Sequence, residues 1–564
     1  MNNNDKKLKQ INKKSKTSKQ NIKKSKNIFL KWLPMIVLST ALMIIIIDTT
    51  VLNVSIRNIV NDLNTNIQGI QWVITGYALT LAAFTITGGR LGDLFGRKKM
   101  FMFGAVIFAI GSFITSISKG LPELIIGEAI IEGIGAALMM PATASLLIAN
   151  YSGKDRAIAF GIWGGIAGAS SGIGPILGGW LTTNYSWRWA FRINIIVAIL
   201  LLIGAKFIAE SRDRTEKKQL DILGVILSAS GLLLFVYGII ESSTYGWWVA
   251  TKPYLVFGLS LLPSKVSVTP VAILLGLLIL VLFAFWEKYI EKQGHTPLVS
   301  LGLFKNKQFT SGAVTVSLMS LGMTGLIFAL PVFLQSVQGL DALHTGLALA
   351  PLSLAVLIMA PTSAALTSYF TPKRLIQTGL LISTLASLVI MTLLSPTASA
   401  LHLAPGLAMY GIGMGMVFAQ ASNLTLSAVS VDQSGEASGV NNTIRQIGTS
   451  FGSAIIGAVV LTSLSGGITA GVKNSQVIPD NIKQTMAQTA SNQEFNFGSD
   501  NKTNKRIPES ISSELTKIAN QASADASKKA MLYTAGFMLM ALGVSSFMPN
   551  AKELDKSAKP AMGH

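Results

Sequence analysis

The stretch GGRLGDLFGRKKM, from Gly88 to Met100, places five charged side chains among thirteen residues of an otherwise apolar region. It is preceded by WVITGYALTLAAFTIT (72–87) and followed by FMFGAVIFAIGSFITS (101–116), and neither segment carries a charge. A helix of about 20 apolar residues crosses a bilayer core of about 30 Å. The pattern therefore predicts two membrane-spanning helices joined by a short, charged, glycine-rich turn at the membrane surface.

The composition extends this prediction to the whole chain. Half of the 564 residues are hydrophobic, only 13% are charged, and the mean hydropathy is +0.52. Soluble domains carry about 25% charged residues, and a soluble helical bundle would need amphipathic helices, whereas most segments here are apolar all round. We therefore expect an all-α polytopic membrane protein. The absence of cysteine excludes disulfides, thiolate nucleophiles and cysteine metal sites.

Fourteen segments are long and apolar enough to be read as spanning helices. Six precede and six follow two additional helices, so the sequence predicts two six-helix bundles with a pair between them. The predicted helices are 33–53, 70–90, 99–118, 121–148, 157–181, 189–209, 220–240, 267–287, 310–337, 343–366, 374–394, 399–424, 441–464 and 530–549.

The distribution of lysine and arginine predicts the orientation of these helices. Residues 1–31 contain eleven lysines and one acid, Asp5, and so supply +10 of the net charge of +20. GRKK, GKDR, SRDRTEKK, FKNK and TPKR occupy alternate loops on the same side as this tail. The positive-inside rule then puts both termini in the cytoplasm of a multi-pass protein of the cell (cytoplasmic) membrane. No aromatic residue interrupts the lysines before Phe29, so we expect the tail to contact anionic lipid rather than nucleic acid.

These boundaries divide the chain into five parts. The loop within the last bundle is long enough to escape the positive-inside rule, and its Asn, Ser, Gln and Lys content predicts a solvated, disordered extracellular segment. The parts are a basic cytoplasmic tail (1–32), an N-terminal six-helix bundle (33–209), two additional helices with linkers (210–309), a C-terminal six-helix bundle with extracellular loop 465–528 (310–549) and a cytoplasmic tail (550–564).

Asp93 in the opening stretch needs a partner. It can pair with Arg97, four residues later, or accept hydrogen bonds at the N-terminus of a neighbouring helix. The glycines permit a tight turn with positive φ and a close approach of backbones. A weaker copy, LTSYFTPKR (366–374), keeps the leucine, the phenylalanine and the basic pair of LGDLFGRKK (91–99) but loses the acid. A duplicated six-helix half with one asymmetric turn would produce this pair.

GRLGDLFGRKK resembles the loop 2–3 signature of the major facilitator superfamily, G-x-L-a-D-r-x-G-r-k. In that superfamily this loop is understood to lock a gate in the outward-facing state. The resemblance therefore implies a gating role for the matching residues, which are Gly89, Asp93, Gly96, Arg97 and Lys98.

The predicted helix 157–181 contains a stripe of small residues at steps of three and four, which share one helix face. One interpretation is a packing seam in which two backbones approach closely, with a proline that weakens the helix midway. The stripe also resembles the antiporter signature G-x(8)-G-x(3)-G-P-x(2)-G-G of exporters in the same superfamily, and this implies export. Its residues are Gly161, Gly165, Gly168, Gly172, Gly174, Pro175, Gly178 and Gly179.

Further motifs resemble the fourteen-helix drug:proton antiporters, the quaternary-ammonium and multidrug exporters. They are IDTTVLNVSI (47–56), WRWAFRINI (187–195), FWEKYIEKQGHTPLVSLGLFKNKQF (285–309) and SGEASGVNNTIRQIGTSFG (434–452). The resemblance implies export of lipophilic, often cationic, drugs by a monomer that uses the proton gradient and no cofactor. The alternative is a proton-coupled exporter or flippase of one endogenous metabolite or lipid, because fold does not fix substrate. The family's usual arginine in the fourth helix is missing from GEAIIEGIGAALMMP (127–141).

Acids inside predicted spanning helices are the candidate functional residues, because each costs about 2.5–3.5 kcal/mol at a helix centre. Asp48 and Glu128 lie at similar predicted depths, and Glu132 lies one turn deeper on the same helix face as Glu128. We expect these carboxylates to bind the proton and the cationic substrate. Alternatively, Asp48 is structural and the glutamates pair with Arg192. Arg445, near the inner end of helix 441–464, either joins the site or extends its charge to the membrane surface.

Other function classes lack their motifs. We find no D-D-x-x-D, H-E-x-x-H or P-loop pattern, so neither an enzyme nor a transporter driven directly by ATP is expected. His295, His344, His402 and His564 have no metal-binding spacing, so no metal site is expected.

Overall fold

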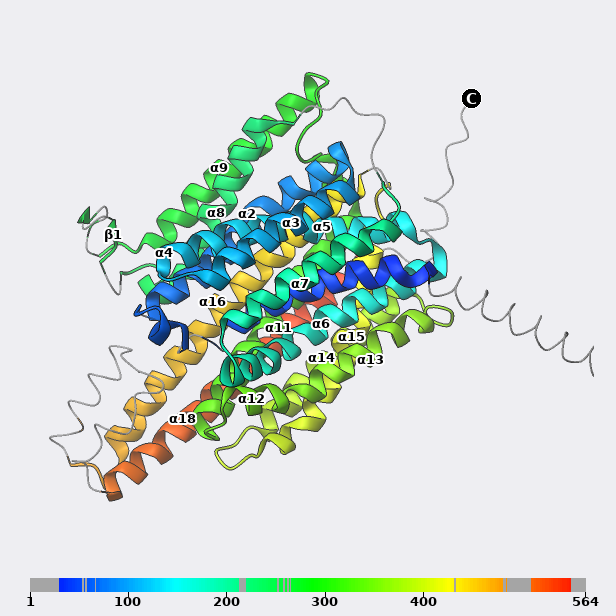
Figure 1. Cartoon of the computed structure of the whole chain (residues 1–564). Helices are drawn as coiled ribbons and strands as arrows, with labels where there is room; N and C mark the ends of the chain where they lie inside the picture. Colours follow the sequence, from blue (N-terminus) through cyan, green and yellow to red (C-terminus); the bar gives the residue numbers. More distant parts are fainter. Residues whose placement is uncertain are drawn as a thin grey trace, which may run out of the picture.

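The computed structural model of this chain is a bundle of long helices (Figure 1). The predicted C-terminal tail, 550–564, lies outside the described residues. So does the predicted N-terminal tail, 1–32, except for Leu30 to Trp32. The structure describes residues 30–52, 55, 58–65, 67–211, 220–250, 253–256, 259–260, 263, 265–430, 433–479, 483 and 509–548.

The first six predicted helices are present, and the fourth of them is built from three consecutive segments. These elements are Leu30–Leu52, α2 (Ile67–Phe95), α3 (Arg97–Ile117), α4 (Leu121–Leu124) continued by the π-helix η1 (Ile125–Glu132) and α5 (Gly133–Asn150), α6 (Gly153–Asn184), and α7 (Arg188–Gly204) followed by the 3₁₀ turn η2 (Ala205–Phe207).

The two additional helices, α8 (Ile222–Tyr245) and α9 (Val268–Lys292), pack against each other, and α8 also contacts α2 and α16. A short antiparallel hairpin between them pairs β1 (Leu255–Val256) with β2 (Leu259–Ser260). The second half of the chain then forms α10 (Gly302–Lys305), α11 (Lys307–Val337), α12 (Ala342–Ala348), α13 (Ala350–Leu366), α14 (Pro372–Leu393), α15 (Ala400–Leu426), α16 (Ser434–Asn474) and α18 (Glu509–Ser545).

Every predicted spanning segment overlaps a helix of the structure. By length and apolar composition, 11 of the described helices can cross a membrane, or 12 when the two parts of the bent α6 count as one span. The apolar α13 has only 17 residues, and α18 is not among the 11. The all-helical, multi-pass class is therefore confirmed, whereas the number of fourteen spans stays a prediction.

The prediction of a solvated loop over 465–528 was wrong at both ends. Helix α16 continues to Asn474, and α18 begins at Glu509. Gly467 packs against Ala522, and Gly471 packs against Ile518, so small residues join the two helices there. At 1.5 Å per residue, the 41 residues of α16 extend about 60 Å, twice a bilayer core. This helical pair forms the extension at the lower left of Figure 1.

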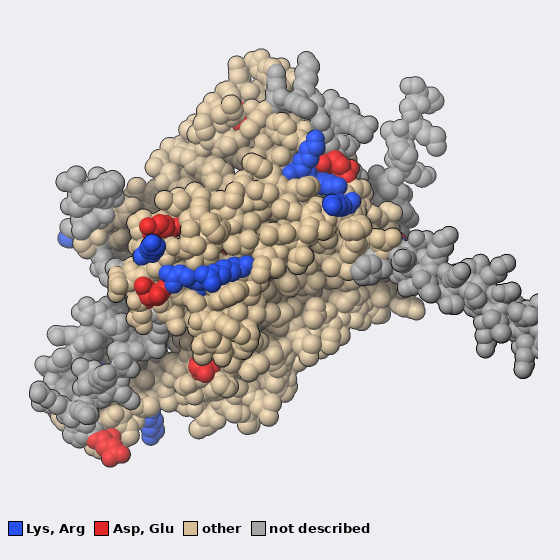
Figure 2. Space-filling view, in the orientation of Figure 1, with Lys and Arg blue, Asp and Glu red and all other residues tan. Residues whose placement is uncertain are grey.

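Apolar side chains divide between two cores and an exposed surface. One core gathers residues such as Leu38, Phe101 and Phe160 from the N-terminal half, and a second gathers residues such as Phe333 and Tyr410 from the C-terminal half. Outer helices such as α7 and α9 expose many large apolar side chains. Figure 2 shows one face on which most of the surface between charged side chains near the two ends is uncharged. This is the surface expected against lipid.

The charged ends allow the two sides of the bundle to be named. The first turn of α3 carries Lys98 and Lys99, and the first turn of α14 carries Lys373 and Arg374. We call this the basic end, and the side that carries the turn between α3 and α4 the opposite end.

The predicted small-residue stripe of α6 is a packing seam with two partners. A Cβ added to Gly161 would lie 2.9 Å from the carbonyl oxygen of Ala360 in α13, across the boundary between the halves. A Cβ on Gly174 would collide with Thr50, in the first helix. Helix α6 bends by 46° between Ser170 and Ile173, which is where a proline at position 175 disturbs the preceding turn. The predicted weakening by Pro175 is confirmed.

A methyl group on this seam should therefore destabilise the protein. We expect Gly161→Ala to lower the free energy of unfolding by about 1–3 kcal/mol, because the added carbon overlaps backbone atoms of α13. The measurement is thermal unfolding of the purified protein in detergent. Gly466→Ala in α16 is the matched control, because a Cβ there meets nothing within 4 Å. Equal melting temperatures for the two variants would contradict the seam.

Candidate functional site

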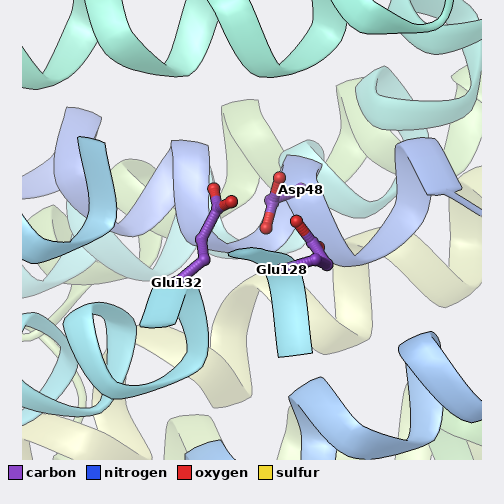
Figure 3. Close-up of side chains that lie close together, drawn as sticks. All are labelled: Asp48, Glu128 and Glu132. Atoms are coloured by element: carbon purple, nitrogen blue, oxygen red, sulfur yellow. The ribbon is translucent and has the colours of Figure 1, made fainter. Parts of the chain in front are cut away.

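Three buried acids lie together inside the N-terminal half. Asp48 comes from the first helix, and Glu128 and Glu132 come from η1. One oxygen of each carboxylate lies within 4.8 Å of the others. Asp48 is 3% exposed, and neither glutamate is exposed at all. Figure 3 shows the three side chains converging on one place. We call these residues the acid cluster.

The backbone around the glutamates explains how they reach Asp48. Residues Ile125–Glu132 form a π-helix, whose wider turns are rare and often occur at functional sites. Glycines bring α3 against this segment, because a Cβ on Gly111 would lie 2.5 Å from the backbone nitrogen of Glu132. On the other side of this contact, in η1, a Cβ on Gly127 would lie 2.6 Å from Oγ1 of Thr115 in α3. The glutamate backbone is thus fixed by direct contact with α3.

Two polar side chains that the sequence analysis did not single out donate hydrogen bonds to the acid cluster. Nδ2 of Asn194 in α7 lies 2.7 Å from Oδ1 of Asp48 and 3.1 Å from Oε1 of Glu132. The hydroxyl of Ser112 in α3 also donates to Oε1 of Glu132. Asn194 lies within the motif WRWAFRINI, and a lone amide in that apolar helix was the available signal.

The remaining oxygens of the acid cluster have no donor among the described residues. These are Oδ2 of Asp48, both oxygens of Glu128 and Oε2 of Glu132. None of the three acids forms an ion pair within the described part of the chain. An ionised carboxylate only accepts hydrogen bonds, so two facing carboxylates can bond directly only when one carries a proton. Several adjacent ionised carboxylates would repel one another in a dry interior. The arrangement therefore suits groups that take up protons or a cation.

Arg192 does not join the acids, and the alternative in which it pairs with Glu128 and Glu132 was wrong. Its side chain is exposed, and its guanidinium carbon lies 5.2 Å from the ring centre of Trp189. Residues two positions apart point to different faces of a helix. Because Asn194 faces the acids, Arg192 must face away from them.

A small cavity adjoins the acid cluster. It measures about 60 Å³ and is lined by Asp48 and Asn194 together with apolar side chains such as Met43, Leu177 and Val197. A few water molecules would fit there, because a single water needs only about 10–15 Å³ of such space. The space is too small for a drug molecule, so this conformation offers the acids contact with water rather than with a large substrate.

The opening stretch forms a second polar site, at the basic end. Arg97 donates to Oδ1 of Asp93 from Nε at 2.9 Å and from Nη2 at 2.7 Å. The same carboxylate accepts from the backbone nitrogens of Gly435 at 3.1 Å and Glu436 at 2.7 Å. Those nitrogens belong to the first turn of α16, where helix N–H groups lack internal partners. Both predicted partners of Asp93 are therefore confirmed.

Two glycines allow the backbone of the α2–α3 turn to approach its neighbours closely. A Cβ on Gly89 would lie 2.4 Å from the carbonyl oxygen of Gly435, so α2 and α16 touch backbone to backbone. Gly96 has φ 111°, a conformation that side chains disfavour, and a Cβ there would lie 3.0 Å from the carboxylate of Glu210. The backbone nitrogen of Lys98 donates to that carboxylate at 3.0 Å. We call the contact of the α2–α3 turn with the start of α16 the gate, after the role that the resemblance implies, and its two sides touch here.

The weaker copy of the stretch behaves differently. Thr371 accepts a hydrogen bond from the backbone nitrogen of Arg374 at the start of α14. Nζ of Lys373 donates to the carbonyl oxygens of Ser546 and Met548, at the end of α18. Both partners lie in the C-terminal half, so without an acid this turn stays within its own bundle. The asymmetry that the sequence predicted is confirmed.

Arg445 lies deeper than expected. Helix α16 begins at Ser434, seven residues before the predicted start, so Arg445 is more than two turns inside it. Its Nη2 lies 3.8 Å from the sulfur of Met140 in α5, and the side chain is half-buried. The interpretation that it reaches the membrane surface was wrong, because it faces the other half of the protein.

The opposite end has an ion pair that sequence reasoning missed. Arg188 pairs with Asp62 and donates to the carbonyl oxygen of Ser118 at 2.8 Å. Nε1 of Trp187 donates to Oδ2 of Asp62 at 3.0 Å. Partial burial raises the pKa of Asp62, but the hydrogen bonds from Arg188 and Trp187 outweigh it and hold that pKa below its usual value. The motif WRW thus joins α7 to the segments that follow the first and third helices.

Comparison with known proteins identifies similar transporters. The family described as Major Facilitator Superfamily matches residues 38–453. The "Probable actinorhodin transporter" of Streptomyces coelicolor is 30% identical over 450 residues, which cover 78% of this chain and 74% of that protein. The "Tetracenomycin C resistance and export protein" of Streptomyces glaucescens is 27% identical over 431 residues, covering 76% of each chain.

A solved structure supports the fold alone. The human organic anion transporter MFSD10 (TETRAN) superposes with a TM-score of 0.54 over 91% of this chain and 99% of its own, at 11% sequence identity.

The ion pair of Arg97 with Asp93 predicts how removal of Arg97 changes the stability of the protein. We expect Arg97→Ala to lower the free energy of unfolding by about 3–5 kcal/mol, because Asp93 would remain buried without its cation. Lys99→Ala, two residues away on an exposed side chain, is the control and should change it by no more than about 0.5 kcal/mol. Both are measured by thermal unfolding in detergent. A tolerated Arg97→Ala would show that α16 and the nearby Arg90 are sufficient to hold Asp93.

Proposed function

The chain belongs to the Major Facilitator Superfamily, and from that premise we propose that it exports lipophilic, often cationic, drugs in exchange for protons. The protein is a multi-pass membrane protein of a family of transporters. Its relatives include proteins named for export of, or resistance to, antibiotics. Proton coupling, the site residues and the orientation are our inferences from the geometry.

The observation that carries the proposal is the acid cluster. Asp48, Glu128 and Glu132 are buried side by side, and four of their six oxygens have no donor among the described residues. With protons bound, the cluster is neutral and tolerates its apolar surroundings; without them it attracts a cation. Proton and cationic cargo therefore exclude each other. An alternating-access cycle that exposes the cluster to one side at a time converts this exclusion into exchange.

The gate supplies the second part of the cycle. We take the basic end as cytoplasmic, with both termini on that side, because lysine and arginine accumulate there. Asp93 and Arg97 then close the cytoplasmic side, and the acids can exchange only with the outside in this conformation. Opening the gate requires α2 to separate from α16. The bend and the small-residue seam of α6 give the halves a second contact along which they can move.

The remaining features follow from the same scheme. The proton gradient supplies the energy, no cofactor takes part, and one chain contains both halves of the cycle, so a monomer is sufficient. The lysine-rich tail holds the basic end against anionic lipid of the cytoplasmic membrane.

The decisive experiment places the purified protein in liposomes with an imposed pH gradient and follows ethidium. We expect transport that depends on the gradient, because protons must leave the acid cluster for the dye to bind. Asp48→Asn, Glu128→Gln and Glu132→Gln should each reduce transport to near the rate of protein-free liposomes. Equal transport after the gradient is collapsed would refute proton coupling.

Two control variants separate the acid cluster from charge in general. Glu123→Gln changes an exposed acid on the same continuous helix as the two glutamates. Arg192→Ala removes the exposed arginine that does not contact the acids. Both should transport like the parent protein. Loss of transport in these controls, or normal transport in all three acid variants, would move the site elsewhere.

A further inference from the structure

Helix α9 carries a buried acid that the transport scheme does not use. Glu287 has no exposed surface. Its Oε2 accepts hydrogen bonds from the backbone nitrogens of Leu298 at 2.8 Å and Val299 at 3.5 Å. The chain therefore turns back after α9 and is held against that helix. Leu298 and Val299 are themselves buried.

The next backbone nitrogen along the chain binds the gate. Ser300 donates to Oε1 of Glu436 at 2.6 Å, and the backbone nitrogen of Glu436 is one of the donors to Asp93. Three consecutive N–H groups are thus shared between α9 and the start of α16. Leu298 and Val299 also pack in the same apolar core as Ala437 and Val440 of α16. The segment after α9 is therefore attached to the C-terminal side of the gate.

The segment that leads toward α8 binds the other side of the gate. Oγ of Ser211 accepts from Nη1 of Arg97 at 2.6 Å, and its carbonyl oxygen accepts from the backbone nitrogen of Arg97 at 3.0 Å. Glu210 accepts from the backbone nitrogen of Lys98 at 3.0 Å. Arg97 and Lys98 begin α3, which belongs to the N-terminal half.

Helices α8 and α9 are joined to each other at this same end. Nε1 of Trp286 donates to both oxygens of Asp221, at 3.0 and 2.9 Å, and Asp221 also accepts from the backbone nitrogen of Gly224. A Cβ on Gly224 would lie 2.7 Å from Oε1 of Glu287, so the backbone of α8 lies directly against that carboxylate. The pair is one unit with a connection to each half.

We propose that α8 and α9 stabilise the closed gate by bridging it, through Glu210 and Ser211 on one side and Leu298–Ser300 on the other. We call these two segments the bridge. Glu287 is its positioning residue, because it holds Leu298 and Val299 where Ser300 can reach Glu436. Closure of the gate thus coincides with hydrogen bonds to the segments on both sides of α8 and α9. The additional helices would thus set the balance between closed and open conformations, whatever the substrate.

Spin-label distances across the gate test this directly. The chain contains no cysteine, so Lys99→Cys in α3 and Tyr369→Cys in the turn between α13 and α14 give two labels on exposed sites of opposite halves. Double electron–electron resonance in lipid nanodiscs then measures the populations. We expect one short distance for the parent. Glu287→Ala should add a longer distance and raise its population several-fold. Glu291→Ala, an exposed acid four residues later on α9, should match the parent.

A second pair of variants tests the bridge without changing Glu287. Ser300→Pro removes the backbone donor to Glu436, and Ser300→Ala keeps it. Only Ser300→Pro should populate the longer distance. Should Glu287→Ala fail to fold, this pair decides. Unchanged distances in both Glu287→Ala and Ser300→Pro would overturn the proposal and leave Glu287 with a merely structural role. The proposal relies on the proposed function only in taking the closed gate as one state of a transport cycle, and the distances require neither a proton gradient nor a drug.

Discussion

The cost of burying a carboxylate separates Asp93 at the gate from the three residues of the acid cluster. Asp93 is buried beside a guanidinium and two helix N–H groups, so its charge is balanced in place. The acid cluster is equally buried, yet Asn194 and Ser112 supply only neutral donors to it. Burial without a counter-charge is tolerated only when a proton or a cation can supply the missing charge. The first kind of acid joins α2 and α3 to α16, and the second is the kind that the proposed proton exchange requires.

Backbone contacts at glycine make both arrangements possible. Gly89 allows α2 to touch α16, which brings Asp93 to the N-terminus of that helix. Gly111 allows α3 to touch η1, which fixes Glu132 beside Asp48. Contacts of this kind have no intermediate separation, because a small displacement exposes unpaired polar groups on both sides. A bundle built on them favours discrete states, and alternating access depends on such states.

Local sequence rules predicted part of this arrangement and failed where tertiary contacts decide. The partners of Asp93 follow from charge spacing and helix ends. The meeting of Asp48 with Glu128 follows from a shared depth, and that of Glu128 with Glu132 from helical periodicity. Arg192 was assigned to the acids because the rotation of α7 about its axis was unknown, and Asn194 takes its place. The helical extension from Ser465 to Asn474 was missed because it is rich in small and polar residues, which pack against α18 through Gly467 and Gly471 and give a weak hydropathy signal. The contacts of Glu287 join residues whose proximity no periodicity indicates.

The position of α8 and α9 in the chain explains how the proposed bridge could restrain the separation of the two halves. The polypeptide leaves the N-terminal half after Ser211 and enters the C-terminal half near Ser300, so both crossings occur at the basic end, beside the gate. A linker that crossed at the opposite end could not resist separation of α3 from α16. The crossing segments are hydrogen-bonded to Arg97 on one side of the gate and to Glu436 on the other. Under the proposal, an insertion between two bundles restrains their relative motion, and the hydrogen bonds of this restraint involve no residue of the acid cluster.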